Sequence, residues 1–185
     1  MAKVLDQALA FAIKAHEGQF RKGTQIPYIL HPMEAASIVG TMTTDEEIIA
    51  GAALHDVVED TDTTVDDIIA LFGERIGGLV ASESENKRED LPAASTWKIR
   101  KQETLDHLKS APIEVKMITL GDKLSNIRAI YRDYQSISDE LWQRFNQKDK
   151  HEHYWYYSSI AQCLTELSSF QAYKEYCELV EKTFL

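Results

Sequence analysis

Apolar residues recur at spacings of three and four along almost the whole chain, and no segment alternates apolar and polar residues as a strand does. This periodicity predicts an all-α protein. We expect a helix from Val4 that stops at Gly18, one from Pro32 to Val39, and one from near Asp45 that includes IIAGAALHDVV. A short helix capped by Thr63 or Thr64 should end at Gly73, and another short one should run to about Ala81. Two further helices are expected over 97–108 and 113–134.

The stretch IIAGAALHDVV is apolar on nearly all sides, which is typical of a helix buried at the centre of a bundle. Two polar segments interrupt the helical pattern. Residues 82–95 are predicted to form a long exposed loop, and residues 135–150 to be less ordered. The tail over 151–184 predicts two packed helices. We therefore expect a single domain over residues 1–185, with a core over about 1–134 and the C-terminal helices, about 151–184, packed on it.

The composition narrows the classes of partner. The 185 residues include 20 Lys plus Arg against 30 Asp plus Glu, a formal charge of −10, and 44% are hydrophobic. The hydrophobic content excludes wholesale disorder. The negative charge argues against a nucleic-acid partner, because proteins bind nucleic-acid backbones through clustered Lys and Arg. Cys163 and Cys177 show no CxxC spacing, which favours a reducing compartment. Without a signal peptide or an 18-residue apolar run, we expect a cytoplasmic protein and no membrane partner.

Four potential metal ligands lie where polar side chains are not expected. His55 and Asp56 are adjacent within the buried stretch. Asp122 lies in the middle of the apolar helix over 113–134, and His31 closes a loop immediately before a helix. Each alone is typical of a capped or salt-bridged structural residue, but a buried carboxylate needs a partner. A divalent cation would partner all four groups, and imidazoles with carboxylates suit Mn²⁺, Fe²⁺ or Zn²⁺ better than Ca²⁺.

Glu59 and Asp60 follow His55 and Asp56 by four residues, so each is predicted to project from the same helical face as its partner. They would then lie near the open positions of the metal, where one could accept a proton from bound water. The structural alternative is that they simply end the helix. Because two acids at a helix C-terminus oppose the helix dipole, we favour the functional interpretation.

Several cations are candidates for binding phosphate. Arg21 and Lys22 are the best of them, because they lie in the short loop that leads to His31. The others are Lys87 and Arg88 in the polar loop, Lys98, Arg100 and Lys101 in the helix after it, and Lys123 and Arg128 beside the face of Asp122 and Asn126. At least half of them are expected to be solvated surface.

Other histidines are given lower weight. His151 and His153 are two residues apart and diverge on a helix, so the segment HEHYWYY is interpreted as core packing or the edge of a lid. His16, in a setting that resembles surface, and His107 have no obvious partner and are interpreted as structural.

Three runs, AHEGQFRKGTQIPYILHP, HDVVEDTDTT with FGERI, and LGDKLSNIRAI, resemble the HD-domain hydrolases of the RelA/SpoT-homologue group, in particular the stand-alone small alarmone hydrolases. The resemblance spans about residues 5–130 and implies a compact multi-helix bundle with a metal site, typically Mn²⁺, in its centre. It implies the metal ligands His31, His55, Asp56 and Asp122, the catalytic pair Glu59 and Asp60, and the substrate-binding residues Arg21, Lys22 and Asn126, with the arginine associated with the guanine base.

The implied reaction removes pyrophosphate from the 3′ position of guanosine tetra- or pentaphosphate, giving GDP or GTP. Metal-bound water, with its pKa lowered from about 15.7 to about 7–9, would attack phosphorus while Glu59 or Asp60 accepts its proton. The run ASESENKRED replaces a VTxxK pattern of many relatives, so the substrate-facing loop differs. Another nucleotide substrate, such as an adenosine alarmone or NADPH, and a non-catalytic nucleotide sensor remain alternatives. The sequence leaves the oligomeric state open.

Overall fold

The computed structural model describes residues 3–85, 88 and 90–185, and within them the chain is helical with no strand, which confirms the all-α prediction. The elements are α1 (Val4–Ala15), α2 (Leu30–Val39), α3 (Glu46–Leu54), α4 (Val57–Asp60), α5 (Val65–Phe72), α6 (Glu74–Glu83), α7 (Ala93–Ser110), α8 (Ile113–Ile137), the 3₁₀ helix η1 (Ser138–Arg144), α9 (Lys150–Cys163), the 3₁₀ helix η2 (Thr165–Leu167) and α10 (Gln171–Phe184). Every helix of this described part is too short or too polar to cross a bilayer.

Local chemistry sets several helix ends as the sequence predicts. Asp45 caps α3 by accepting a hydrogen bond from the Glu47 amide at 3.0 Å. Thr64 and Asp67 form a reciprocal capping box at the start of α5. Gly73, at a φ of +91°, ends α5, because glycine adopts this left-handed backbone without a steric penalty.

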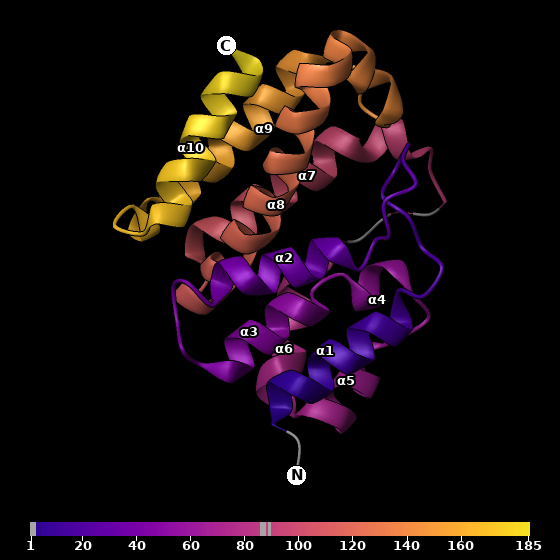
Figure 1. The fold of residues 1–185 in the computed structure, drawn as a ribbon, viewed down its shortest axis with the longest axis vertical. Helices are drawn as coiled ribbons and strands as arrows, with labels where there is room; N and C mark the ends of the chain where they lie inside the picture. Colours follow the sequence, from indigo (N-terminus) through magenta and orange to yellow (C-terminus); the bar gives the residue numbers. More distant parts are fainter. Residues whose placement is uncertain (1–2, 86–87, 89) are drawn as a thin grey trace.

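The helices form two groups that meet at the middle of the molecule (Figure 1). Near the N-terminal end, α1, α3, α5 and α6 enclose an apolar cluster that includes Ala8, Leu54 and Ile76. A larger cluster fills the other group, where α8 packs against α2 and α10. Helix α3 contributes to both clusters, which explains why its sequence is apolar on nearly all sides.

Helices α2 and α8 pack closely at Gly121. A Cβ atom at this position would lie 2.8 Å from the Ala35 carbonyl oxygen and 2.8 Å from Cγ2 of Val39. Only glycine therefore fits without a shift of either helix. The contact sets how deeply the next residue, Asp122, enters the centre of the molecule.

Several predicted boundaries are wrong. Helix α2 begins at Leu30 rather than at Pro32. The first turn of a helix tolerates a proline because the amide groups of that turn have no intrahelical partner. The predicted buried helix is interrupted, since α3 ends at Leu54 and α4 begins at Val57. The segment 135–150 contains η1, which the buried side chain of Trp142 anchors by stacking on Phe184 with ring centroids 5.6 Å apart.

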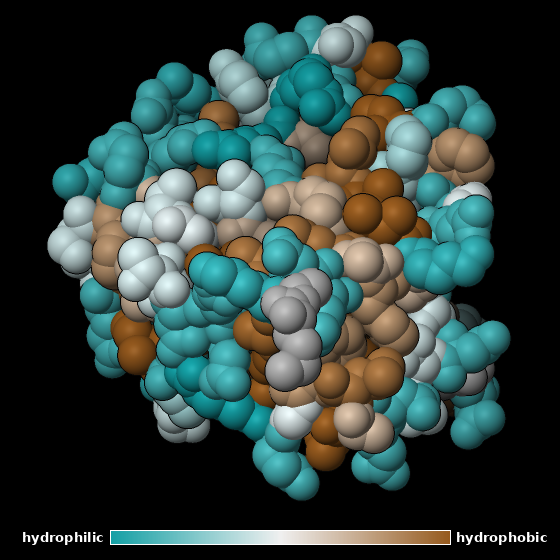
Figure 2. Space-filling view, turned by 60° about the horizontal axis from the view of Figure 1, so that its bottom comes forward, coloured by the Kyte–Doolittle hydropathy of each residue, from teal (hydrophilic) through white to brown (hydrophobic). Residues whose placement is uncertain are grey.

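Figure 2 looks toward the end of the molecule formed by α1, α3, α5 and α6 and shows apolar side chains exposed among polar ones. Leu71 of α5 is 56% exposed, and Ile13 of α1 is 55% exposed. Exposed apolar side chains are common on folded proteins. The groups with distinctive chemistry lie instead in the interior, between the two clusters.

Candidate metal centre

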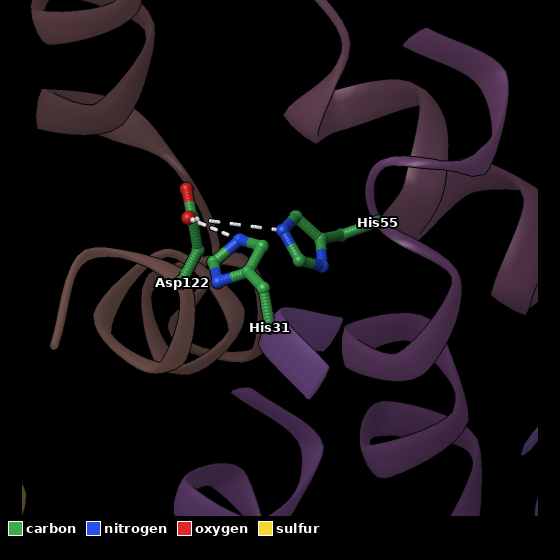
Figure 3. Close-up of side chains that lie close together, drawn as sticks. All are labelled: His31, His55 and Asp122. Atoms are coloured by element: carbon green, nitrogen blue, oxygen red, sulfur yellow. Dashed lines mark ion pairs between the residues drawn. The ribbon is translucent and has the colours of Figure 1, made fainter. Parts of the chain in front are cut away.

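Four side chains predicted as metal ligands converge between α2, α3, α4 and α8. Nε2 of His31 lies 3.3 Å from Oδ2 of Asp56 and 3.2 Å from Oδ1 of Asp122. Nε2 of His55 lies 3.1 Å and 3.7 Å from the same two oxygens. His31, His55 and Asp122 are buried and each offers one ligand atom within 4.8 Å of the others (Figure 3). The sequence prediction thus selects residues that the fold brings together.

Two adjacent residues at the junction of α3 and α4 reach the same centre. His55 is the C-cap of α3, and Asp56 is the N-cap of α4. Both keep right-handed helical backbone angles, and on a helix adjacent side chains point about 100° apart. The His55 ring and the Asp56 carboxylate therefore approach His31 from different directions.

Hydrogen bonds at the far side of each imidazole orient its ligand nitrogen. Ser125 Oγ donates to Glu34 Oε2 at 2.8 Å, so it accepts from Nδ1 of His31, also at 2.8 Å. Nδ1 of His55 donates to the Ala52 carbonyl at 2.7 Å. In the neutral form of each imidazole, Nε2 therefore carries the lone pair, on the side of the carboxylates. Nε2 of His55 is buried and, among the described residues, has no partner with hydrogen-bond geometry, although it lies 3.1 Å from Asp56 Oδ2, as expected of an atom that can ligate a cation.

The charges of the cluster also suit a cation. Although burial alone would raise the pKa of Asp122, Lys123 and the two imidazoles hold that pKa well below its ordinary value. Burial alone would lower the pKa of His55, but the carboxylates of Asp56 and Asp122 raise it well above its ordinary value. Without a metal the centre therefore holds a proton on His55. A divalent cation can replace that proton and balance the two carboxylates.

Tyr28 links the predicted ligand Asp56 to the predicted catalytic residue Asp60. Its hydroxyl lies 2.7 Å from Asp56 Oδ2 and 2.9 Å from Asp60 Oδ2. Burial, followed by the two neighbouring carboxylates, raises the pKa of Tyr28, so the phenol remains a proton donor. Sequence reasoning missed this residue, although it lies in the PYILHP run that carries the resemblance.

The predicted substrate-binding residues divide into three cases. Arg21 donates to Oδ1 of Asn126 at 2.6 Å, and Asn126 in turn donates to Asp122, so both residues adjoin the centre. Lys22 lies nearer the surface and donates to Asn146 at 3.2 Å. Lys87 lies outside the described residues.

Two cavities flank the cluster, with volumes of about 340 and 440 Å³. They share His31 and the following neighbours: Arg21, Tyr28, Lys101, Lys123 and Asn126. The smaller cavity is rich in carboxylates, namely Glu59, Asp60, Glu83, Glu85 and Glu103. The larger one combines the aromatic side chains of Trp97, Phe145, Tyr156 and Tyr157 with the cations Lys22, Arg132 and Arg144. The two cavities therefore differ in charge and in aromatic character.

The prediction of an exposed loop over 82–95 is wrong for its first residues. Helix α6 continues to Glu83, and Glu83 and Glu85 line the smaller cavity. Thr119 Oγ1 lies 2.8 Å from the Glu83 carboxylate, and burial raises the pKa of Glu83 to about 7. A polar sequence gives no signal for this burial, because the contacts come from distant helices α7 and α8.

The remaining histidines do not form a second cluster among the described residues. His153 packs its ring 5.5 Å from that of Trp97 and is buried with Tyr156 and Tyr157, which agrees with core packing for these three residues, whereas His151 is exposed. His107 is exposed. His16 is not at the surface as predicted, since it is 2% exposed and shares a hydrogen bond of 2.8 Å with Gln19.

Comparison with known proteins identifies the class. The family of HD domains matches residues 8–149, so the chain belongs to the HD-domain family. Guanosine-3′,5′-bis(diphosphate) 3′-pyrophosphohydrolase MESH1 of Danio rerio is 35% identical over 132 residues, which cover 70% of each chain. These findings confirm the family resemblance read from the motifs.

Other relatives are longer or are similar mainly in fold. The GTP pyrophosphokinase rsh of Brucella melitensis is 35% identical over 127 residues, which are 69% of this chain and 17% of the relative. The structure of a metazoan orthologue of SpoT that hydrolyses ppGpp has a TM-score of 0.79 at 23% identity, covering 98% and 96% of the two chains. A Listeria monocytogenes EGD-e structure has a TM-score of 0.74 at 31% identity, covering 88% and 100%.

Proposed function

We propose that this protein is a metal-dependent phosphohydrolase that removes the 3′-diphosphate of guanosine tetra- and pentaphosphate, releasing pyrophosphate and GDP or GTP. The observation that carries the proposal is the cluster of the buried His31, His55 and Asp122 with the half-buried Asp56, beside two cavities. The guanosine substrate follows the name of the MESH1 relative. Mn²⁺ is the proposed ion, since imidazole with carboxylate suits it.

His31, His55, Asp56 and Asp122 would hold the cation, which lowers the pKa of water and polarises the phosphoryl oxygen. Glu59 or Asp60, both in the smaller cavity, would accept the proton of the attacking water. The new P–O bond forms as the bond from phosphorus to the ribose 3′ oxygen breaks, and the electron pair and a proton pass to that oxygen. Tyr28 holds Asp60 at a fixed distance from Asp56.

The two cavities supply a way to orient the nucleotide. The larger cavity has aromatic walls and more cations than carboxylates, which suits a base and the 5′ phosphates. Arg21, with its guanidinium carbon 5.6 Å from the centre of the Tyr28 ring, lies between this cavity and the cluster. Placed in this way, the 3′-diphosphate points to the metal ligands and into the smaller cavity. The half-buried free thiols of Cys163 and Cys177 suit the reducing cytoplasm, where we place the reaction.

A substrate panel tests the function. The protein is incubated with Mn²⁺, Mg²⁺ or Zn²⁺ and with guanosine tetraphosphate, its adenosine analogue or NADPH, and released pyrophosphate and orthophosphate are measured separately. We expect pyrophosphate from guanosine tetraphosphate with Mn²⁺. Orthophosphate from NADPH alone, or binding without turnover, would overturn the proposal.

Glu59→Gln separates proton transfer from metal binding. Because this change removes a base but no metal ligand, we expect an unchanged metal content and a rate lower by about 10²–10⁴-fold. Asp60→Asn is the matched variant, since it removes the neighbouring carboxylate in the same way. Wild-type turnover in both variants would show that the base lies elsewhere.

A further inference from the structure

Three donors on α7 converge on one carboxylate beside the candidate metal centre. Arg100 Nη1 donates to Glu85 Oε2 at 3.0 Å, and Lys101 Nζ donates to Oε1 at 2.6 Å. Thr104 Oγ1 lies 3.0 Å from the same Oε1 atom. All four side chains line the smaller cavity, together with His55 and Asp122.

This donor set has the chemistry of a phosphate site. A guanidinium, an ammonium and a hydroxyl group are the side-chain donors that proteins use to bind phosphate oxygens. The Arg100, Glu85 and Lys101 side chains are only 11%, 12% and 17% exposed, so their charges are poorly screened by solvent. Nε of Arg100 is buried and has no hydrogen-bond partner among the described residues, so Glu85 leaves part of the guanidinium unused.

We propose that Arg100, Lys101 and Thr104 form a phosphate subsite, which the Glu85 carboxylate occupies in the free protein and the distal phosphate of the 3′-diphosphate occupies in the complex. The identity of that phosphate rests on the proposed function. Glu85 can leave the subsite without unwinding a helix, because α6 ends at Glu83 and the backbone at Ser84 is extended. A phosphate group carries more negative charge than the carboxylate that it replaces and has a third oxygen for the free Nε of Arg100.

Glu85 is ionised in this position. Burial alone would raise its pKa, but the ammonium group of Lys101 and the hydrogen bonds lower it below the ordinary value. Glu85 therefore competes with an anionic ligand at neutral pH. Removal of its charge should strengthen anion binding, whereas a carboxylate that merely joins α6 to α7 would give no such gain.

Calorimetric titration of the metal-loaded protein with inorganic pyrophosphate tests the subsite. We expect Glu85→Gln to bind pyrophosphate about tenfold more tightly than the wild type, since the internal competitor is lost. Adding Thr104→Val to this variant should reverse part of the gain, because it removes one of the three donors.

Glu103→Gln is the matched control. Glu103 lines the same cavity and carries the same charge, but it binds Arg88 and, within the described part of the chain, forms no hydrogen bond or ion pair with the three donors. We expect its affinity for pyrophosphate to change by less than about twofold. An equal gain in both variants would indicate a general effect of cavity charge, and no gain in Glu85→Gln would overturn the subsite.

Two further measurements keep the outcome interpretable. If Glu85→Gln does not fold, Arg100→Gln in the wild-type background tests the same subsite, with weaker pyrophosphate binding expected and unchanged binding refuting it. Because pyrophosphate binding is measured without turnover, a gain in Glu85→Gln with no hydrolysis of guanosine tetraphosphate would overturn the proposed function alone. Hydrolysis of guanosine tetraphosphate by the wild type, with no gain in pyrophosphate affinity in Glu85→Gln, would overturn the subsite alone.

Discussion

Ser125 is the sharpest test of the metal centre, because it touches a ligand without being one. Its hydroxyl is buried, accepts from Nδ1 of His31 and donates to Glu34. The change Ser125→Ala removes one oxygen atom and leaves the Nδ1 hydrogen of His31 without a partner. The imidazole can then place its hydrogen on Nε2, in which state that nitrogen cannot bind a cation.

The expected size of this effect follows from the geometry. A buried donor that loses its partner costs about 1–3 kcal/mol. Loss of a hydrogen bond behind a metal ligand typically lowers metal affinity by about 10–100-fold, which corresponds to ~1.4–2.8 kcal/mol. The cost of the unpaired donor and the expected loss of metal-binding free energy are therefore of the same size. The fold should survive the change, because Arg128 still binds Glu34 at 2.9 Å.

Competition with a fluorescent chelator measures the Mn²⁺ affinity of Ser125→Ala against the wild type. Ser158→Ala is the control, since Ser158 is a half-buried serine of α9 whose side chain, among the described residues, bonds to the Trp155 carbonyl alone. We expect weaker Mn²⁺ binding in Ser125→Ala alone, with turnover restored at saturating metal. An unchanged affinity would refute the assignment of His31 as a ligand oriented through Ser125.

Three other predictions concern packing, protons and substrate. Gly121→Ala should lower the free energy of unfolding by about 1–3 kcal/mol in urea, because the new Cβ would lie 2.8 Å from the Ala35 carbonyl, and equal stability would contradict the close packing of α2 on α8. The pKa of His55 is raised in the folded metal-free protein, so the protonated ring stabilises that protein fully below the ordinary pKa of 6.5 and less as the pH rises through the pKa of the folded state. The Tm of the metal-free protein should therefore fall above pH 6.5, and a Tm that does not change with pH would contradict this prediction. Arg21→Ala should raise KM about tenfold, and an effect on kcat alone would argue against substrate binding.

The sequence predicts the metal centre better than it predicts the helix ends around it. His55, Asp56 and Asp122 are conspicuous because ionisable groups within apolar runs need partners, and this requirement does not depend on an accurate helix boundary. The break between α3 and α4 leaves no such signal. His55 and Asp56 keep right-handed helical backbone angles, and no glycine or proline lies within three residues of either.

The residues that line the smaller cavity could not be predicted from the sequence, because their contacts come from distant parts of the chain. Glu85 lies in a run of polar residues, and its carboxylate is bound by side chains of α7 that come 15 to 19 positions later. Trp142 likewise lies in a polar segment, and its burial depends on Phe184 at the far end of the chain. Local patterns carry no information about partners at that separation.

The position of the ligands has a consequence for the cooperativity of unfolding. Asp56 lies beside Val57 of the smaller apolar cluster, whereas Asp122 lies between Leu120 and Leu124 of the larger one. A cation shared by these carboxylates would add a second link between two clusters that helix α3 already connects. Metal-loaded protein should then lose both clusters in one transition, whereas in the metal-free protein the smaller cluster can open by itself.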